Sequence, residues 1–227
     1  MKKLASPFLR LAVFALAVAA VIACGDNKLG PSVPASVSRV SGDSQTVLVG
    51  NRASAPLVAL VKNTDGSPLP NVQVRWSVVS GGGSLTTIVD TTDVNGKVSN
   101  TYLSAAIVAT AKVAAVAGGQ SGEFTVILAP DTTGTITAFG GDGAAALVGN
   151  ALTLTAKAVD RFGNAIKGID VTWTTSSGQL QVQTGTTDST GKTTNVITVG
   201  PDTGKVAIVA TSRFNSITFT VSALDTI

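Results

Sequence analysis

Two short phrases in the sequence combine side-chain oxygens with a glycine in a way that could bind a metal ion. They are TTDVNGK at 91–97 and TTDSTGK at 186–192. In the first phrase Asp93, Asn95 and Gly96 have the spacing that opens a calcium loop, where oxygens at alternate positions bind the ion. A complete calcium site needs about 6 to 8 oxygen ligands, including a late bidentate acid.

A tight turn accounts better for what the two phrases share. No acid follows Asp93 before Glu123, and the second phrase lacks the amide of the first. Asp93 and Asp188 can each accept a hydrogen bond from the backbone two residues on, and Gly96 and Gly191 can supply a positive φ. We therefore predict a hairpin turn at both phrases, with no metal and no cofactor.

Three further acids leave a second cation hypothesis open. Asp43 and Asp142 each follow a glycine at corresponding places, and Asp131 lies between the two halves of the chain. A calcium ion between two domains would need several such acids to converge. The acids are sparse, so this is a minor hypothesis.

The remaining composition argues against an enzyme. The chain has no histidine and a single cysteine, which excludes a Ser-His-Asp arrangement and a Cys/His zinc site. A carboxylate-based glycosidase needs two acids held a defined distance apart, whereas the chain has one glutamate and aspartates mainly at predicted turns. A lone cysteine also forms no intrachain disulfide. We predict a protein that is not an enzyme.

That cysteine, Cys24, has a specific chemical use. Residues 1–23 have a positively charged start and then 13 uncharged residues, Leu11 to Ala23, too few to span a bilayer as a helix. The sequence Val-Ile-Ala-Cys that ends at Cys24 resembles the lipobox of bacterial lipoproteins, with valine where leucine is commoner. The resemblance implies that Cys24 is acylated and begins the mature protein; a free thiol or an intermolecular disulfide is the alternative.

The net charge of the mature chain does not favour a strongly acidic or a strongly basic partner. Three of the 16 Lys and Arg residues lie in residues 1–23, the expected signal peptide. The chain from Cys24 onward then has 13 Lys and Arg and 13 Asp and Glu, so its net charge is zero. We therefore expect no nucleic acid as a partner. In some bacteria an acid directly after the lipidated cysteine retains the protein at the inner membrane. Gly25 stands there, which favours the outer membrane or cell surface over the periplasmic face of the inner membrane.

The mature chain is a duplication. Four further segments recur in the same order, which indicates one domain copied and trimmed in its loops. They are SGDSQTVLVGN and GGDGAAALVGN, NVQVRW and GIDVTW, KVAAVA and KVAIVA, and FTV in both halves. The expected organisation is a signal peptide at 1–23, a lipidated tether at 24–36 with two prolines, and domains at 37–129 and 130–227.

Apolar residues alternate with polar ones within each copy. Val72, Val74 and Trp76 are two apart, as are Val171 and Trp173 in the second copy. A period of two is typical of half-buried strands in antiparallel sheets. The alanine-rich segment 105–117 carries enough β-branched residues to favour a strand over a helix. The fold class is all-β, with two tandem β-sandwiches.

The repeated turn and tryptophan-strand segments resemble those of bacterial immunoglobulin-like domains of the invasin and intimin type, also called Big-1-like. The pattern lies at 65–76 with 91–96, and at 160–173 with 186–191, and the resemblance covers roughly 37–227. It implies tandem immunoglobulin-like sandwiches, here without the paired cysteines of antibody domains.

Four aromatic residues are expected in the cores of the sandwiches, because each is in register with inward apolar neighbours. They are Trp76, Trp173, Phe124 and Phe219. Tyr102 and Phe162 are the only plausible candidates for an exposed aromatic residue, and Phe162 lies in the predicted turn RFGN.

The function expected is that of a membrane-anchored envelope or cell-surface lipoprotein. Its modules would serve adhesion, protein interaction or spacing, because sandwiches leave their loops free to contact a partner. The alternative is a carbohydrate-binding surface module that uses Tyr102 or Phe162. Whether the partner is a protein or a glycan stays open.

Overall fold

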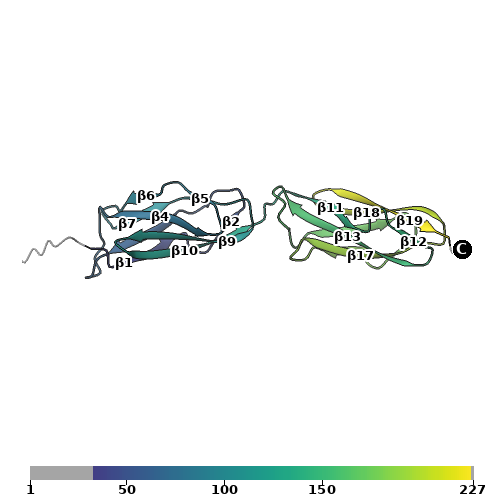
Figure 1. Ribbon diagram of the computed structural model, residues 1–227, viewed down its shortest axis with the longest axis horizontal. Coiled ribbons are helices and arrows are strands. Elements are labelled where there is room, and N and C mark those ends of the chain that lie inside the picture. Colours follow the sequence, from purple (N-terminus) through teal and green to yellow (C-terminus); the bar gives the residue numbers. More distant parts are fainter. Residues whose placement is uncertain (1–32, 226–227) are drawn as a thin grey trace, which may run out of the picture. The chain divides into compact units, whose positions relative to one another are not determined.

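The computed structural model describes residues 33–225, and every regular element among them is a β-strand (Figure 1). These residues fall in one compact unit that contains two separate hydrophobic cores. The predicted all-β fold with two sandwiches is confirmed. The predicted signal peptide, Cys24 and most of the tether lie outside the described residues.

The first sandwich has a three-stranded sheet in the order β1-β3-β7, a five-stranded sheet in the order β2-β10-β9-β4-β6, and the short pair β5-β8. Its strands are β1 (Ser36–Ser41), β2 (Gln45–Leu48), β3 (Leu57–Lys62), β4 (Gln73–Ser80), β5 (Ser84–Leu85), β6 (Val89–Thr91), β7 (Lys97–Asn100), β8 (Tyr102–Leu103), β9 (Ala109–Ala117) and β10 (Gln120–Ala129).

The second sandwich has a four-stranded sheet in the order β11-β13-β17-β15 and a five-stranded sheet in the order β12-β19-β18-β14-β16. Its strands are β11 (Gly134–Gly140), β12 (Ala145–Leu147), β13 (Ala151–Asp160), β14 (Asp170–Thr175), β15 (Gln179–Leu180), β16 (Thr184–Thr186), β17 (Lys192–Thr198), β18 (Gly204–Ser212) and β19 (Ser216–Leu224).

The two sandwiches share irregular features as well as strand order. In each, the second strand pairs in parallel with the last, β2 with β10 and β12 with β19, while the other named pairs are antiparallel. A bulge interrupts the first strand of each at the same place, between Arg39 and Ser41 and between Ala138 and Gly140. Because a bulge places an extra residue on one strand, Val40 and Phe139 occupy equivalent positions.

The period of two in the sequence becomes alternate burial in the strands. In β4, Val74 and Trp76 are buried while Arg75 and Ser77 are exposed. In the alanine-rich segment the strand begins only at Ala109, and the residues before it form a loop. Burial of the inward side chains is the main favourable contribution to each core.

Each core is built around one tryptophan and one phenylalanine. Trp76 and Trp173 are each 1% exposed, and Phe124 and Phe219 are fully buried. The ring centroids of Trp76 and Phe124 are 5.7 Å apart, and those of Trp173 and Phe219 are 5.6 Å apart. Tilted rings at this distance attract each other beyond the effect of burial alone.

The prediction of a hairpin at the repeated phrase is wrong in one respect. The phrase connects β6 with β7 in the first sandwich and β16 with β17 in the second. These strands belong to opposite sheets, so the phrase is a turn that crosses from one sheet to the other. Turn residues specify the local bend but not which sheet the next strand joins. The sequence pattern therefore could not distinguish a hairpin turn from a turn that crosses between sheets.

Candidate functional site

The aspartate of each repeated phrase binds the backbone of its own turn. Asp93 Oδ1 accepts hydrogen bonds of 2.8 Å from the backbone N–H of Asn95 and of Lys97. Asp188 accepts the corresponding pair in the second sandwich. The bond from the Lys97 N–H is the largest effect on the pKa of Asp93, and the pKa lies below its ordinary value. The carboxylates therefore stabilise a turn.

The glycine of each phrase lies where a side chain would not fit. Gly96 and Gly191 have φ of +72° and +76°, a region that glycine adopts without the steric cost of a Cβ. A Cβ on Gly96 would come within 2.8 Å of the Val61 carbonyl oxygen, and one on Gly191 would collide with that of Ala158. The turn packs against the neighbouring strand, which explains why glycine recurs.

A threonine in each phrase has a role that the sequence did not reveal. Thr92 is 2% exposed, and its hydroxyl donates to Leu69 O at 2.6 Å and accepts from Val72 N at 2.9 Å. In the second sandwich the Thr187 hydroxyl likewise donates to Ile166 O and accepts from Ile169 N. The hydroxyl joins the turn to the loop between the third and fourth strands.

The acids proposed for calcium each bind their own sandwich. Asp43 accepts from Thr125 N at 2.8 Å, and Asp142 accepts from Thr220 N at 2.9 Å. Within residues 33–225, no group of three or more His, Cys, Asp or Glu residues is placed to hold a metal ion. The geometry gives these acids structural contacts.

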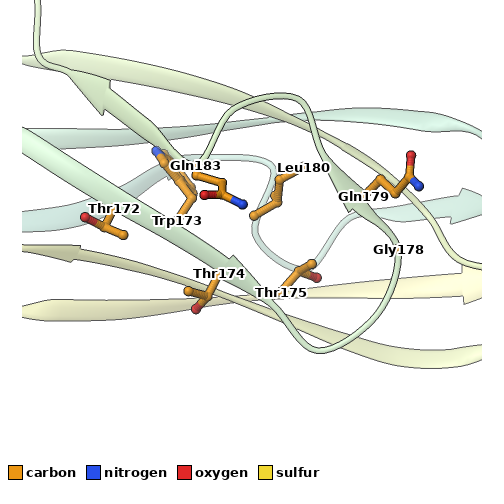
Figure 2. A pocket seen from close by; sticks show the side chains of 8 residues that line it. All are labelled: Thr172, Trp173, Thr174, Thr175, Gly178, Gln179, Leu180 and Gln183. Carbon is orange, nitrogen blue, oxygen red and sulfur yellow. The ribbon is translucent and has the colours of Figure 1, made fainter.

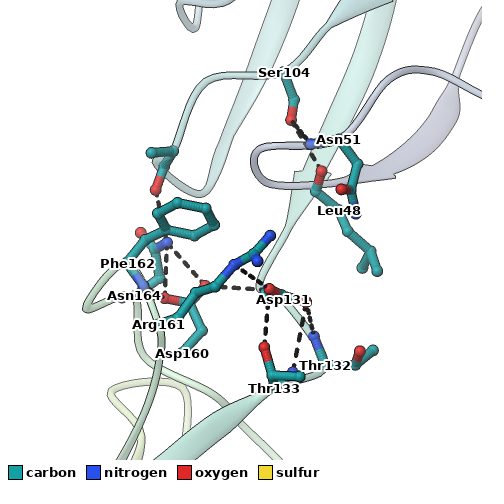
Figure 3. A network of polar contacts seen from close by, with 11 residues as sticks. Leu48, Asn51, Ser104, Asp131, Thr132, Thr133, Asp160, Arg161, Phe162 and Asn164 are labelled. Carbon is teal, nitrogen blue, oxygen red and sulfur yellow. Dashed lines mark hydrogen bonds and ion pairs between the residues drawn. The ribbon is translucent and has the colours of Figure 1, made fainter.

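Asp131 belongs to a polar network at the start of the second sandwich (Figure 3). Its Oδ2 lies 2.6 Å from Arg161 Nε, and its backbone N–H donates to Asp160 Oδ2 at 3.0 Å. Asp160, 3% exposed, also accepts from the backbone N–H groups of Phe162 and Asn164. The linker is thereby fixed to the loop after β13.

The two acids of this network have pKa values below the ordinary range. Burial, the largest effect, raises the pKa of Asp131, but hydrogen bonds from Thr133 and Thr132 and the Arg161 guanidinium together outweigh it. Burial also raises the pKa of Asp160, and the hydrogen bonds from Asn164 and from backbone N–H groups outweigh it. Both carboxylates are charged at neutral pH.

The same loop contacts the first sandwich. Asn164 Nδ2 donates to Ala106 O at 2.8 Å, and Asn164 Oδ1 accepts from Val108 N at 3.3 Å. The ring of Phe162 lies against Gly50, where an added Cβ would be 2.7 Å from the ring. These contacts give Phe162 a structural role.

The two aromatic residues considered as candidates for a sugar site differ in exposure. Tyr102 is fully buried, and its hydroxyl donates to Gly82 O at 2.5 Å, which removes Tyr102 as a candidate for an exposed aromatic residue that binds sugar. Burial raises the pKa of its phenol. Phe162 is 41% exposed, and the Arg161 guanidinium lies 4.7 Å from its ring centroid. Tyr102 has no exposed ring, and the Phe162 ring is in contact with Gly50 of the first sandwich as well as with Arg161.

An open groove of about 520 Å³ runs beside β14 and the loop after it (Figure 2). Thr172, Thr174 and Gln183 line it together with Leu180. Its lining includes no acid and no base, so it can donate and accept hydrogen bonds but offers no group for general acid–base catalysis. Among residues 33–225 there is no acceptor for the buried indole N–H of Trp173 beneath the groove, nor for that of Trp76 in the first sandwich.

An exposed aromatic residue that the sequence pattern did not single out lies on the four-stranded sheet of the second sandwich. Phe139 is 53% exposed, and the ammonium nitrogens of Lys192 and Lys157 lie 4.0 Å and 5.6 Å from its ring centroid. We call these three residues the Phe139 patch. Its signal in the sequence was a difference between the copies: Val40 is the equivalent of Phe139.

Among the described residues, no helix is long and apolar enough to cross a membrane.

Comparison with known proteins gives a likeness in structure only. No protein-family model and no curated protein matches the chain. FdeC, an Escherichia coli adhesin, is 17% identical over 85% of this chain and 65% of its own, with a TM-score of 0.50. Yersinia pseudotuberculosis InvD is 18% identical over 84% of this chain and 57% of its own, with a TM-score of 0.49.

The D0–D1 domains of intimin are 20% identical over 83% of this chain and 95% of their own, with a TM-score of 0.34. The chain spans less than two thirds of the FdeC and InvD structures. At these identities the likeness concerns the fold. The described residues form two tandem immunoglobulin-like sandwiches, a fold shared with the FdeC structure.

Proposed function

We propose that this protein is a non-catalytic, lipid-anchored protein of the bacterial envelope that presents two immunoglobulin-like sandwiches at the cell surface for adhesion. One observation carries the proposal. The polar residues that recur in both sandwiches, among them Asp93 and Asp188, bind their own backbone and hold the fold. The repeated residues therefore do no chemistry, and the outward faces are left for a partner.

The anchor in this proposal is Cys24. Its place after a 13-residue uncharged segment is the sequence support for acylation. A single acyl chain binds a membrane only marginally, whereas the several chains of a lipoprotein hold it firmly. Gly25 after the cysteine favours the outer membrane.

The fold supports an adhesive role by analogy. FdeC, whose fold this chain shares, is described as an adhesin. Sandwiches with short connections give a stable scaffold, and binding residues on such scaffolds lie on outward faces and loops. The neutral Thr-rich and Ser-rich surface of the strands is suited to polar contacts.

Protease treatment of intact cells tests the surface location. We expect external protease to remove the wild-type protein while a periplasmic marker survives. The Cys24→Ser variant should leave the membrane fraction and lose its acyl label, because serine has no thiol to acylate. A wild-type protein that resists protease until the envelope is opened would refute surface display.

A further inference from the structure

The Phe139 patch concentrates positive charge on one sheet face. Lys157 on β13 and Lys192 on β17 are directly opposed partners in the antiparallel register, so their side chains leave the same face. Both ammonium groups approach the ring of Phe139, which the bulge in β11 places beside them. Two like charges directly opposed across a sheet repel each other.

Nothing in the described structure neutralises this pair by direct contact. Within residues 33–225, neither Lys157 nor Lys192 has a carboxylate oxygen within 4.0 Å. Along the chain the nearest acid to Lys157 is Asp160, which accepts hydrogen bonds from its own loop. The nearest acid to Lys192 is Asp188, whose Oδ1 accepts hydrogen bonds from the turn. The backbone hydrogen bond from Lys192 is the main cause that lowers the pKa of Asp188, and the Lys192 charge helps to lower it. The patch keeps two cations available for an anionic partner.

The fold itself does not require this patch, because the first sandwich builds the same position from other residues. There Val40 stands at the bulge in place of Phe139, and Leu60 pairs with Lys97 where Lys157 pairs with Lys192. The opposed pair in the first sandwich therefore contains one cation, Lys97, where the second sandwich has two. The aromatic ring and the second lysine are thus additions to a common scaffold.

We propose that the Phe139 patch binds a carboxylate-bearing polysaccharide, a polymer of uronic acid sugars. The exposed part of the Phe139 ring offers apolar contact to a sugar ring, and the lysine ammonium groups beside the ring can pair with the carboxylate of that sugar. The opposed pair Thr155 and Thr194 lies two residues along the same face and offers hydroxyls to the next sugar. This inference rests on the proposed surface function and names its partner class.

Titration calorimetry with the full chain in neutral detergent tests the proposal. The probe is a fully de-esterified oligogalacturonate, and its fully methyl-esterified form is the neutral control. We expect one site per chain for the acidic probe, weaker binding as salt rises, and no binding of the ester. Phe139→Val and Lys157→Leu should each weaken binding by about tenfold. Undiminished binding by the double variant would overturn the site.

The first sandwich supplies matched controls. Phe139→Val and Lys157→Leu install residues that the first sandwich already carries at this place, so the fold is preserved. The reciprocal pair Val40→Phe and Leu60→Lys should create a second site and change the stoichiometry from one to two. A stoichiometry that stays at one, with the variant folded by circular dichroism, would contradict the assignment.

Two further outcomes test the sugar class and the surface location separately. Equal affinity for polyglutamate, unchanged by Phe139→Val, would overturn the sugar assignment, because that polymer has carboxylates but no ring to stack. If protease removes the protein from cells but oligogalacturonate does not bind, the polysaccharide site fails and surface display stands. If the patch binds oligogalacturonate in a protein that protease cannot reach, surface display fails and the site stands.

Discussion

At the scale of single residues, one buried threonine hydroxyl in each sandwich links the repeated turn to the loop between the third and fourth strands. Thr92 donates to Leu69 O and accepts from Val72 N. Thr92→Val keeps the shape of the side chain but leaves both backbone groups without their partner. We expect the free energy of unfolding to fall by about 1–3 kcal/mol, measured by urea denaturation.

Thr92→Ser is the matched control, because it keeps the hydroxyl and loses one methyl group, worth about 0.8 kcal/mol. The valine variant should be the less stable of the two. The same comparison at Thr187 should give the same order. If valine proves as stable as threonine, the hydroxyl does not hold the loop.

Residue roles in the repeated phrase were only partly predictable. Asp93 and Gly96 were interpreted correctly as turn residues because their chemistry acts within the phrase. Burial of Thr92 depends on Leu69, more than 20 positions away, and local sequence carries no sign of that contact. Tyr102 was predictable: Val98, Asn100 and Tyr102 are two apart, and all three are buried.

At the scale of elements, the alternating pattern was enough to predict strands but not to assign them to sheets. A period of two states which side of a strand is inward, and this holds in β4 and β14. It does not state which strand pairs with which. Assignment of β6 and β7 to opposite sheets depends on packing between distant segments, so the turn between them was predicted as a hairpin.

The turns should make stability depend on acidity. The backbone hydrogen bond from Lys192 is the main cause that lowers the pKa of Asp188. Since the folded pKa lies below the unfolded value of about 3.9, this stabilisation is complete above that pH and is lost as pH falls through the folded pKa. Asp188→Asn should therefore lower the urea midpoint at pH 7. The midpoint of this variant should also fall less steeply than that of the wild type as the pH is lowered.

Asp202→Asn is the control for removal of a surface carboxylate, because Asp202 is exposed and accepts no hydrogen bond from the described residues. The urea midpoint of this variant at pH 7 should equal that of the wild type. Equal slopes for Asp188→Asn and wild type between pH 5 and pH 2 would show that the turn carboxylate contributes nothing to acid sensitivity.

At the scale of the whole molecule, duplication was the most predictable property and difference between the copies the most informative one. Shared residues such as Trp76 and Trp173 mark the cores because both copies must fold. Folding does not explain Phe139, because Val40 fills the equivalent place. The residues that recur in both copies are those that the fold requires. A search for shared residues therefore could not identify the Phe139 patch, which only the second copy has.

Two self-contained cores imply two units of unfolding. The described chain has no cysteine, so each sandwich depends on its own core. Each holds one tryptophan, which makes fluorescence specific to one sandwich in the backgrounds Trp76→Phe and Trp173→Phe. Phe219→Ala should destabilise the second sandwich by about 3–5 kcal/mol and lower only the urea midpoint reported by Trp173.

Phe124→Ala should do the converse, with a lower midpoint reported by Trp76 and an unchanged one reported by Trp173. The hydrogen bonds of Asn164 to the first sandwich are exposed and contribute about 0.5–1.5 kcal/mol each, too little to couple the two transitions fully. If both midpoints fall together in either variant, the sandwiches unfold as one cooperative unit. The loop after β13 would then be the place to look for the coupling.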